Sequence, residues 1–214
     1  PLGIITGAIS TALETQDLPE ATRRELLGTA QSEAQRLHLL VSNLLEITRL
    51  ESGGLDLHRE WVPLEEVIGA VLNRPEWGAE AARVRVRFPE APPWASLDPV
   101  LMEQLLRNLL DNALKYSPAG SPVDLQAWVE GGRLVLALAD QGPGLPLGQE
   151  AQVFEKFVRG PQAAPGAGLG LTICRGIVTA HGGHIEASTQ PSGGARFLVS
   201  LPVGTPPQMP EAGA

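Results

Sequence analysis

The chain has 214 residues, of which 43% are apolar, and its formal net charge is −8 at pH 7. This apolar content can bury a core in one large or two small domains, and the acidic balance argues against a nucleic-acid or anionic-membrane surface. A single cysteine, Cys174, excludes a disulfide framework within the chain and fits a reducing compartment. No apolar run approaches the about 20 residues of a membrane-spanning helix.

Residues 1–51 have a helical pattern in two pieces, separated near Asp17 and Pro19. Apolar or small residues of the second piece recur at alternating spacings of three and four, namely Leu27, Ala30, Ala34, Leu37, Val41, Leu44 and Thr48. This spacing is typical of a coiled-coil seam. Two helices cannot cover their own apolar stripe, so we expect a four-helix bundle in a homodimer formed through residues 1–52. Ser52, Gly53 and Gly54 then mark a domain boundary.

The chain beyond this boundary alternates helices and strands. The pattern predicts a short helix over residues 65–72, a strand at VRVRF (84–88) and a long helix from about Pro99 to Tyr116, capped by Asp98. Two strands follow, VDLQAWV and RLVLALAD, joined through Gly131 and Gly132.

After a long loop over residues 141–168, we expect a helix from about Leu169 to His181 and a closing hairpin of HIEASTQ and ARFLVSLP. The natural packing is an α+β sandwich, a sheet with helices on one face, over residues 55–202. Residues 203–214 are rich in proline and small residues, and we expect a disordered tail there.

The long predicted helix carries a polar face. Five residues share it because of their helical spacing: Gln104, Asn108, Asp111, Asn112 and Lys115. A solvated surface is the ordinary interpretation, but asparagine is a poor helix former and two of the four asparagines lie here, one turn apart. The carbonyl oxygen of Asn112 can coordinate Mg²⁺ without adding negative charge beside a triphosphate. Lys115 is one of only two lysines and could meet phosphate oxygens.

A second candidate is Asp140, which ends a predicted strand and precedes Gly142 and Gly144. A carboxylate only accepts hydrogen bonds, and the exocyclic amine of adenine is a donor. An ordinary turn aspartate is the alternative. In the stretch VFEKFVRG (153–160), two phenylalanines could pin a loop while Lys156 and Arg159 project over it.

A third candidate is the glycine-rich stretch PGAGLGLT (165–172), which runs into a predicted helix. Glycines allow a close backbone approach, and the first amides of a helix attract anions such as phosphate. It is not a Walker loop, because Leu171 and Thr172 replace the lysine and the serine or threonine of that motif. A flexible loop is the alternative.

In chain order, RNLLDNALKY, DQGPGLP, VFEKFVRG and GAGLGL resemble the N box, first glycine box, F box and second glycine box of sensor histidine kinases, the kinases of two-component systems. The stretch SNLLEITRLESG resembles the end of their dimerisation and phosphotransfer hairpin. Several other stretches are most similar to the Kdp-type potassium-sensing kinases. The resemblance implies a Bergerat ATP-binding fold, ATP and Mg²⁺ as ligands, and transfer of the γ-phosphoryl group to a histidine. A receiver-domain aspartate of a response regulator would then accept the group.

The resemblance also implies roles for single residues. Asn112 would be the Mg²⁺ ligand, Asn108 and Lys115 would contact phosphates, Tyr116 would lie along the nucleotide, and Asp140 would read the adenine amine. The glycine boxes and the lid between them would supply the remaining nucleotide contacts, at Gly142, Gly144, Lys156, Arg159, Gly166, Gly168, Leu169 and Gly170.

The acceptor box of the family has the form His-acidic-x-x-x-Pro-Leu, and this chain begins at Pro-Leu. We therefore expect the acceptor histidine, and any membrane anchor of the sensor protein, to lie upstream, with this part on the cytoplasmic side. The chain alone should not phosphorylate itself. Of the remaining histidines, His181 and His184 could suggest a metal site with Cys174, although a histidine before a glycine cap is commoner.

Two other functions stay open at this point. The first is an ATP-hydrolysing clamp of the gyrase and Hsp90 type, which uses a glutamate one turn before the magnesium asparagine. This chain has Asn108 there, and an amide cannot take a proton from water. The second is a nucleotide-binding dimerisation module that transfers nothing.

Overall fold

The computed structural model describes residues 1–15, 17–51, 56–146, 148–158 and 168–204. The chain divides into two compact units, residues 1–48 and residues 49–214. Within the described ranges, no helix combines the length and the apolar character needed to cross a bilayer.

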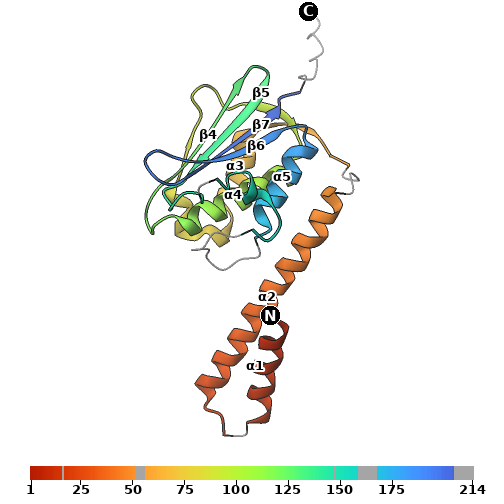
Figure 1. The fold of residues 1–214 in the computed structure, drawn as a ribbon, viewed down its shortest axis with the longest axis vertical. Coiled ribbons are helices and arrows are strands. Elements are labelled where there is room, and N and C mark those ends of the chain that lie inside the picture. The colour runs from red at the N-terminus through yellow and green to blue at the C-terminus, as the bar shows by residue number, and fades with distance from the viewer. Residues whose placement is uncertain (16, 52–55, 147, 159–167, 205–214) are drawn as a thin grey trace, which may run out of the picture. The chain divides into compact units, whose positions relative to one another are not determined.

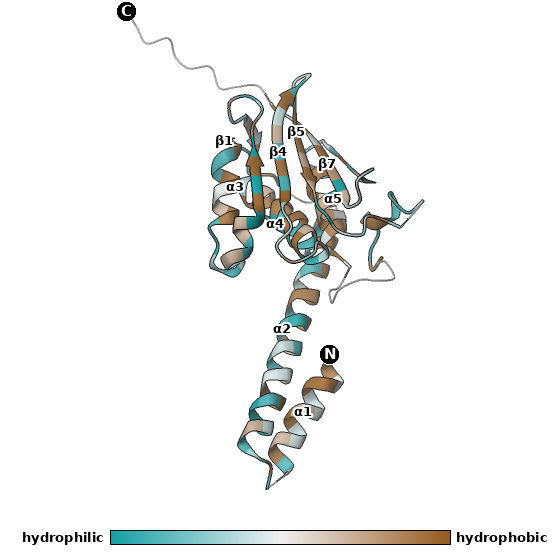
Figure 2. Cartoon of the chain, turned by 90° about the vertical axis from the view of Figure 1, so that its left-hand side faces the viewer, coloured by the Kyte–Doolittle hydropathy of each residue, from teal (hydrophilic) through white to brown (hydrophobic). Residues whose placement is uncertain are grey.

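A helical hairpin makes up the first unit, with α1 (Leu2–Glu14) followed by the long helix α2 (Glu20–Glu51) (Figure 1). This confirms the two helices expected from the sequence. Hydrophobic residues occur along both helices (Figure 2). Ala30 is buried and Leu37 half-buried, whereas Leu27 and Val41 are each 50% exposed. Part of the expected seam is therefore exposed in the single chain, and Leu27 and Ala30 point about 60° apart around the helix, as neighbouring positions of one heptad seam do.

The second unit contains a mixed set of short helices and strands. In chain order these are β1 (Glu60–Pro63), α3 (Leu64–Leu72), the 3₁₀ helix η1 (Pro75–Arg83), β2 (Val84–Arg87), β3 (Trp94–Leu97), α4 (Pro99–Tyr116), β4 (Val123–Glu130), β5 (Arg133–Ala139), the 3₁₀ turn η2 (Gln152–Phe154), α5 (Gly170–Ala180), β6 (His184–Thr189) and β7 (Ala195–Pro202).

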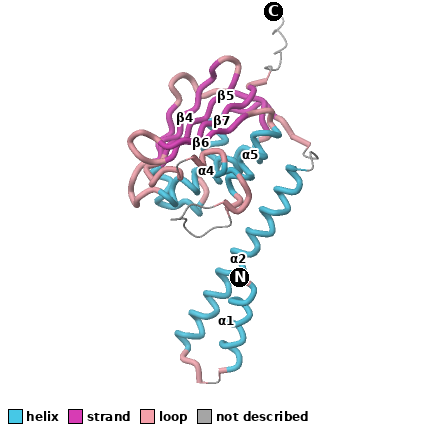
Figure 3. The backbone as a smooth tube through the Cα atoms, in the orientation of Figure 1, coloured by secondary structure: helices cyan, strands magenta, loops and turns pink. Residues whose placement is uncertain are grey.

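Five strands form the main sheet of this unit, in the order β2-β4-β5-β7-β6. Strand β2 runs parallel to β4, and the other neighbours are antiparallel. A separate pair, β1 with β3, is antiparallel. Helices α4 and α5 lie along one side of the main sheet (Figure 3). This arrangement confirms the expected α+β sandwich.

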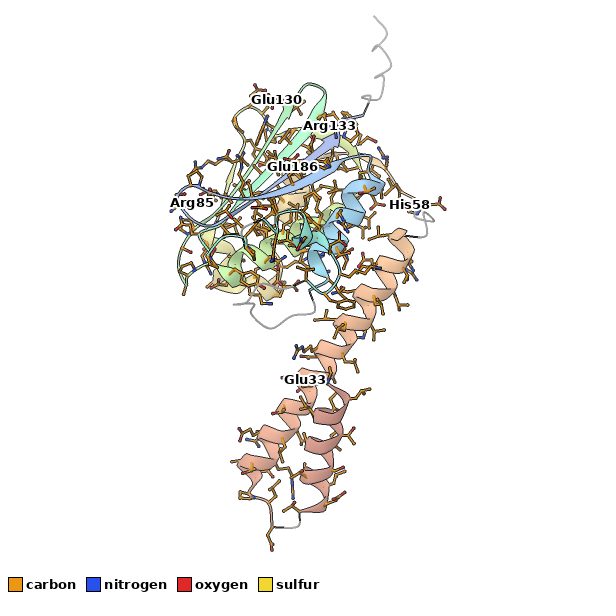
Figure 4. All side chains as sticks on the ribbon, viewed as in Figure 1. Glu33, His58, Arg85, Glu130, Arg133 and Glu186 are labelled. Atoms are coloured by element: carbon orange, nitrogen blue, oxygen red, sulfur yellow. The ribbon has the colours of Figure 1, made fainter. Side chains whose placement is uncertain are left out.

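The core lies between the main sheet and the helices. Along β4 the buried residues Val123, Leu125 and Ala127 alternate with half-buried ones, so one face of the strand packs inward. The other face of β4 carries Asp124, Gln126, Trp128 and Glu130, and Glu130 is labelled in Figure 4.

Local chemistry explains the boundaries of α4. The carboxylate of Asp98 accepts hydrogen bonds from the amides of Val100 (3.1 Å) and Leu101 (3.2 Å), and Pro99 occupies the first turn. The predicted helix from Pro99 to Tyr116 is confirmed at both ends. Between β4 and β5, Gly131 and Gly132 have φ of 57° and 73°, as a tight two-residue hairpin turn requires.

Four elements were not predicted: β1, β3, η1 and η2. Each strand has four residues and pairs only with the other, so neither shows the longer alternation that identifies a strand in a sequence. His58, which the sequence pattern places in a strand-like run, precedes β1 instead. Its backbone amide donates to Oδ2 of Asp98 at 3.0 Å.

Candidate functional site

Four predicted site residues lie on α4, and the helix arranges them along one side. Asn108, Asn112 and Tyr116 are half-buried, and Lys115 is exposed. The Nζ atom of Lys115 lies 5.9 Å from the centre of the Tyr116 ring, within the range of a cation–π contact. From Asn108 to Tyr116 the helix rises about 12 Å, so the two ends of this row are well separated.

Asn108 carries the clearest sign of a ligand-binding position. Its Nδ2 atom is buried and has no hydrogen-bond partner among the described residues. A Cβ atom at Gly170 would lie 3.8 Å from Cγ of Asn108, so this amide faces the start of α5. Leaving a buried donor unpaired costs about 1–3 kcal/mol. An anionic oxygen bound at this point, such as that of a phosphate, would satisfy the donor.

The other end of the row meets the loop that follows β5. The side-chain oxygen of Ser117 accepts the amide of Gln141 at 3.2 Å. A Cβ atom at Gly142 would lie 2.9 Å from the carbonyl oxygen of Tyr116, too close for any side chain. Glycine at position 142 is therefore required for the loop to pack against the end of α4.

Asp140 occupies the start of this loop and is only 4% exposed. Its Oδ1 atom accepts hydrogen bonds from the amides of Gly142 (2.8 Å) and Ala195 (3.0 Å). Burial raises the pKa of Asp140 above its ordinary value, and these two backbone hydrogen bonds act in the opposite direction. Both bonds from described residues fall on Oδ1, which leaves Oδ2 as the oxygen to face a ligand donor.

The predicted second glycine box leads into α5, which begins at Gly170. Leu169 is fully buried and anchors this end, and Gly168 has φ of 69°. The amide of Phe157 donates to the carbonyl oxygen of Gly168 at 3.0 Å, which joins the two ends of the segment between them. Phe157 itself has φ of 62°, an unusual backbone angle for a bulky residue.

Two predicted lid residues, Arg159 and Gly166, lie outside the described residues. Lys156 is exposed beside η2. Gly144, in the loop after β5, has φ of 82°. The structure thus brings together the row on α4, the loop after β5 and the start of α5.

His181 and Cys174 are held by contacts of their own within the second unit. The Nδ1–H group of His181 donates to the carbonyl oxygen of Ile177 at 2.8 Å, and Nε2 accepts the amide of Asp98 at 3.1 Å. Both ring nitrogens are therefore occupied, and burial lowers the pKa of His181. Cys174 is buried, with Sγ 3.8 Å from the carbonyl oxygen of Leu105. The described residues contain no group of three His, Cys, Asp or Glu side chains placed to hold a metal ion.

Comparison with known protein families decides the identity of these two units. The family described as "Histidine kinase-, DNA gyrase B-, and HSP90-like ATPase" matches residues 97–205, and "His Kinase A (phospho-acceptor) domain" matches residues 1–53. The chain belongs to the sensor histidine kinases. Residues 97–205 are the ATP-binding domain of this histidine kinase.

Individual relatives agree with this assignment. The histidine kinase is 47% identical over 174 residues to the sensor protein KdpD of Escherichia coli, covering 80% of this chain and 19% of the relative. It is 34% identical to KdpD of Clostridium acetobutylicum, covering 94% of this chain and 23% of the relative. The crystal structure of full-length ShkA in complex with AMPPNP matches with a TM-score of 0.74 at 28% identity, covering 93% of this chain and 42% of that one. The chain thus spans about a fifth of the length of these curated relatives.

Sequence reasoning missed several residues of the candidate site. Ser117, Gly194 and Ala195 contact the loop after β5 or Asp140 itself. A Cβ atom at Gly194 would lie 2.0 Å from the carbonyl oxygen of Asp140. Nothing in the sequence near Gly194 indicates that this turn packs against a residue more than fifty positions earlier.

Proposed function

We propose that the chain is the catalytic core of a sensor histidine kinase, which transfers the γ-phosphoryl group of ATP to a histidine of the acceptor box. A receiver-domain aspartate of a response regulator would accept the group next. The observation that carries this proposal is Asn108. Its buried, unpaired Nδ2 offers a hydrogen bond to an anion, and its amide cannot serve as a base for water.

The remaining roles follow from position along the site. Asp140, at the buried end, would accept the exocyclic amine of adenine on Oδ2, and Tyr116 would lie along the nucleotide. Asn108, at the other end of the row, would then contact the phosphates, and Lys115, which neighbours Tyr116, would reach them with its long side chain. Lys156 would approach the same phosphates from the far side of the loop. An ATP molecule extended along α4 would thus span the roughly 12 Å between the two ends of the row.

The glycines give the backbone its close approach. Gly142 and Gly144 shape the loop beside adenine, and Gly168 and Gly170 lead into the first turn of α5, where free amides favour phosphate oxygens. Leu169 holds this turn in the core. Arg159 and Gly166 would complete the lid.

Asn112 fits a magnesium ligand, because its half-buried side chain offers a neutral oxygen on the same side of α4 as Asn108. Magnesium bound there would neutralise negative charge on the phosphates during transfer. The protein itself contributes positioning: it holds the phosphate chain by amides and cations, and phosphoryl transfer depends chiefly on such positioning and on charge stabilisation.

The acceptor must come from outside residues 1–214, because none of the four histidines here is followed by the acidic-x-x-x-Pro-Leu pattern. His181 is buried with both nitrogens bonded. His184 lies on β6, where Nε2 is 3.2 Å from Glu186. We infer that the whole protein carries the acceptor box upstream, together with the segments that anchor a sensor in the membrane.

We infer that the chain dimerises through residues 1–52. In the single chain, large apolar side chains on α1 and α2 are exposed to water. Among them are Leu2 (65% exposed), Leu13 (77%), Leu27 (50%) and Leu45 (58%). Pairing two hairpins into a four-helix bundle would bury this surface. The two KdpD relatives, with the resemblance of the sequence to Kdp-type kinases, support a role in potassium or osmotic signalling.

A binding and turnover experiment separates this proposal from its rivals. We expect the chain to bind ATP more tightly with Mg²⁺ than without it, and to release little inorganic phosphate. Sustained ATP hydrolysis would instead support the clamp. Tight ATP binding with no transfer to an acceptor hairpin would support a non-catalytic nucleotide-binding module.

A further inference from the structure

Residues at the hairpin turn between β6 and β7 make several hydrogen bonds to Asp140. The backbone amide of Asp140 donates to the carbonyl oxygen of Ala195 (2.9 Å), and the amide of Ala195 donates back to Oδ1 of Asp140 (3.0 Å). The side chain of Gln190 donates from Nε2 to the backbone carbonyl oxygen of Asp140 at 2.8 Å. The same turn therefore holds the backbone N–H group, the backbone oxygen and one carboxylate oxygen of Asp140.

Gln190 binds Asp140 just beyond the point where the pairing of β5 with β7 ends. The register of β5 with β7 extends to Ala139, and a single further backbone bond reaches Asp140. A residue just beyond the last paired position of two strands lacks a backbone partner for its carbonyl oxygen. The side-chain amide of Gln190 supplies this hydrogen bond to Asp140. The backbone amide of Gln190 donates to the carbonyl oxygen of Gly194 (2.9 Å) and closes the turn. This bond fixes the backbone from which the Gln190 side chain extends.

The residue before Gln190 holds the other end of the same loop. Oγ1 of Thr189 accepts the amide of Leu145 at 3.0 Å and also lies 3.4 Å from the carbonyl oxygen of Leu145. A Cβ atom at Gly144 would lie 2.7 Å from Cγ2 of Thr189, so the loop packs directly against this side chain. Two consecutive side chains thus bind the first part of the loop, at Asp140 and at Leu145.

We propose that Thr189 and Gln190 are positioning residues for nucleobase selection, acting through Asp140; this rests on the proposed role of Asp140 in reading adenine. Selecting a donor at position 6 of a purine requires the carboxylate oxygen to stay at a fixed place. Gln190 restrains the backbone of Asp140 itself, and Thr189 restrains the loop five residues later, at Leu145. Loosening them lets the loop move, so an adenine nucleotide loses more affinity than a 6-oxopurine nucleotide, which offers no amine to Asp140.

The test compares ATP with inosine triphosphate, in which an oxygen replaces the 6-amino group. Dissociation constants for both nucleotides are measured by calorimetry on the 214-residue chain and on three variants. Gln190→Glu keeps the size of the side chain but replaces the donor by an acceptor. Thr189→Val keeps the shape without the hydroxyl group, and Thr189→Ser retains the hydroxyl group. Gln126→Glu, on β4, makes the same charge change as the first variant at a position away from the loop.

We expect Gln190→Glu and Thr189→Val each to lower the ATP preference over inosine triphosphate by about threefold or more, because each removes a hydrogen bond that restrains the loop. Thr189→Ser and Gln126→Glu should keep the preference of the unchanged chain. If Gln190→Glu does not fold by circular dichroism, the ratio in Thr189→Val decides.

The outcomes separate this inference from the proposal on which it rests. An unchanged chain that prefers ATP, with variants that weaken both nucleotides equally, would overturn the inference and leave the role of Asp140 intact. An unchanged chain that binds the two nucleotides equally would overturn the adenine role of Asp140, and the inference with it.

Discussion

Replacing Asp140 by asparagine reverses the proposed recognition while leaving the packing nearly unchanged. The Oδ1 atom of asparagine can still accept the amides of Gly142 and Ala195, which lie 2.8 Å and 3.0 Å from Oδ1 of Asp140. The position of Oδ2 would then hold an NH₂ group. Two donors, the asparagine amide and the adenine amine, would face each other in the complex with ATP.

The size of the effect follows from the bond that is lost. A hydrogen bond to a charged group contributes about 1.5–3 kcal/mol, so Asp140→Asn should weaken ATP binding by roughly 10- to 150-fold. Inosine triphosphate offers an acceptor at the same position, and the variant should bind it at least as well as the unchanged chain does. The preference for ATP should therefore fall or reverse.

Folding provides the control for this variant. Because burial raises the pKa of Asp140, the charged form is disfavoured in the folded state, and stability is lost as pH rises through that raised pKa. Asparagine carries no charge to bury, so the variant should unfold at neutral pH no more easily than the unchanged chain. Calorimetry with both nucleotides and a thermal melt check these points. Equal ATP affinity in the folded variant would refute the role assigned to Asp140.

Three further predictions test other parts of the account. Asn112→Ala should abolish most of the Mg²⁺-dependent gain in ATP affinity, because the side-chain oxygen of Asn112 is the proposed Mg²⁺ ligand. If calorimetry finds the full gain in the variant, this face of α4 is an ordinary solvent-exposed surface. Since burial lowers the pKa of His181, the unfolded state binds more protons, and stability should be complete above pH 6.5 and fall below it. His181→Gln should flatten that fall in urea titrations on both sides of pH 6.5, and an identical pH profile would contradict the assignment. Val41→Glu, which places a charge on the exposed apolar face of α2, should shift the chain from dimer to monomer in light scattering, and an unchanged mass would locate the dimer contact elsewhere.

Local signals explain which parts of the fold the sequence predicts well. Asp98 and Pro99 give α4 a start that depends only on neighbouring residues, and its apolar spacing continues to Tyr116. The glycine pair between β4 and β5 likewise identifies a hairpin by itself. In contrast, β1 and β3 are stabilised by pairing across more than thirty residues, and their four-residue sequences carry no sufficient pattern.

The candidate site shows the same division. Asn108, Asn112 and Lys115 are visible because helical spacing alone places them on one face. The support of Asp140 by Gln190 is not visible, since these residues are fifty positions apart and meet only when β5 and β7 pair. The heptad spacing of α2 predicts an apolar surface, but it cannot tell which of its residues meet α1 and which remain exposed.

The central claim is that this site transfers phosphate to a histidine supplied by an acceptor box. The direct measurement mixes the 214-residue chain with γ-labelled ATP, Mg²⁺ and a separate hairpin that carries the complete box but no ATP-binding domain. We predict acid-labile, base-stable label on the hairpin, none on the chain itself, and loss of labelling with Asn112→Ala. Release of inorganic phosphate with an unlabelled hairpin, or label on the chain that disappears with His38→Ala, would contradict the account.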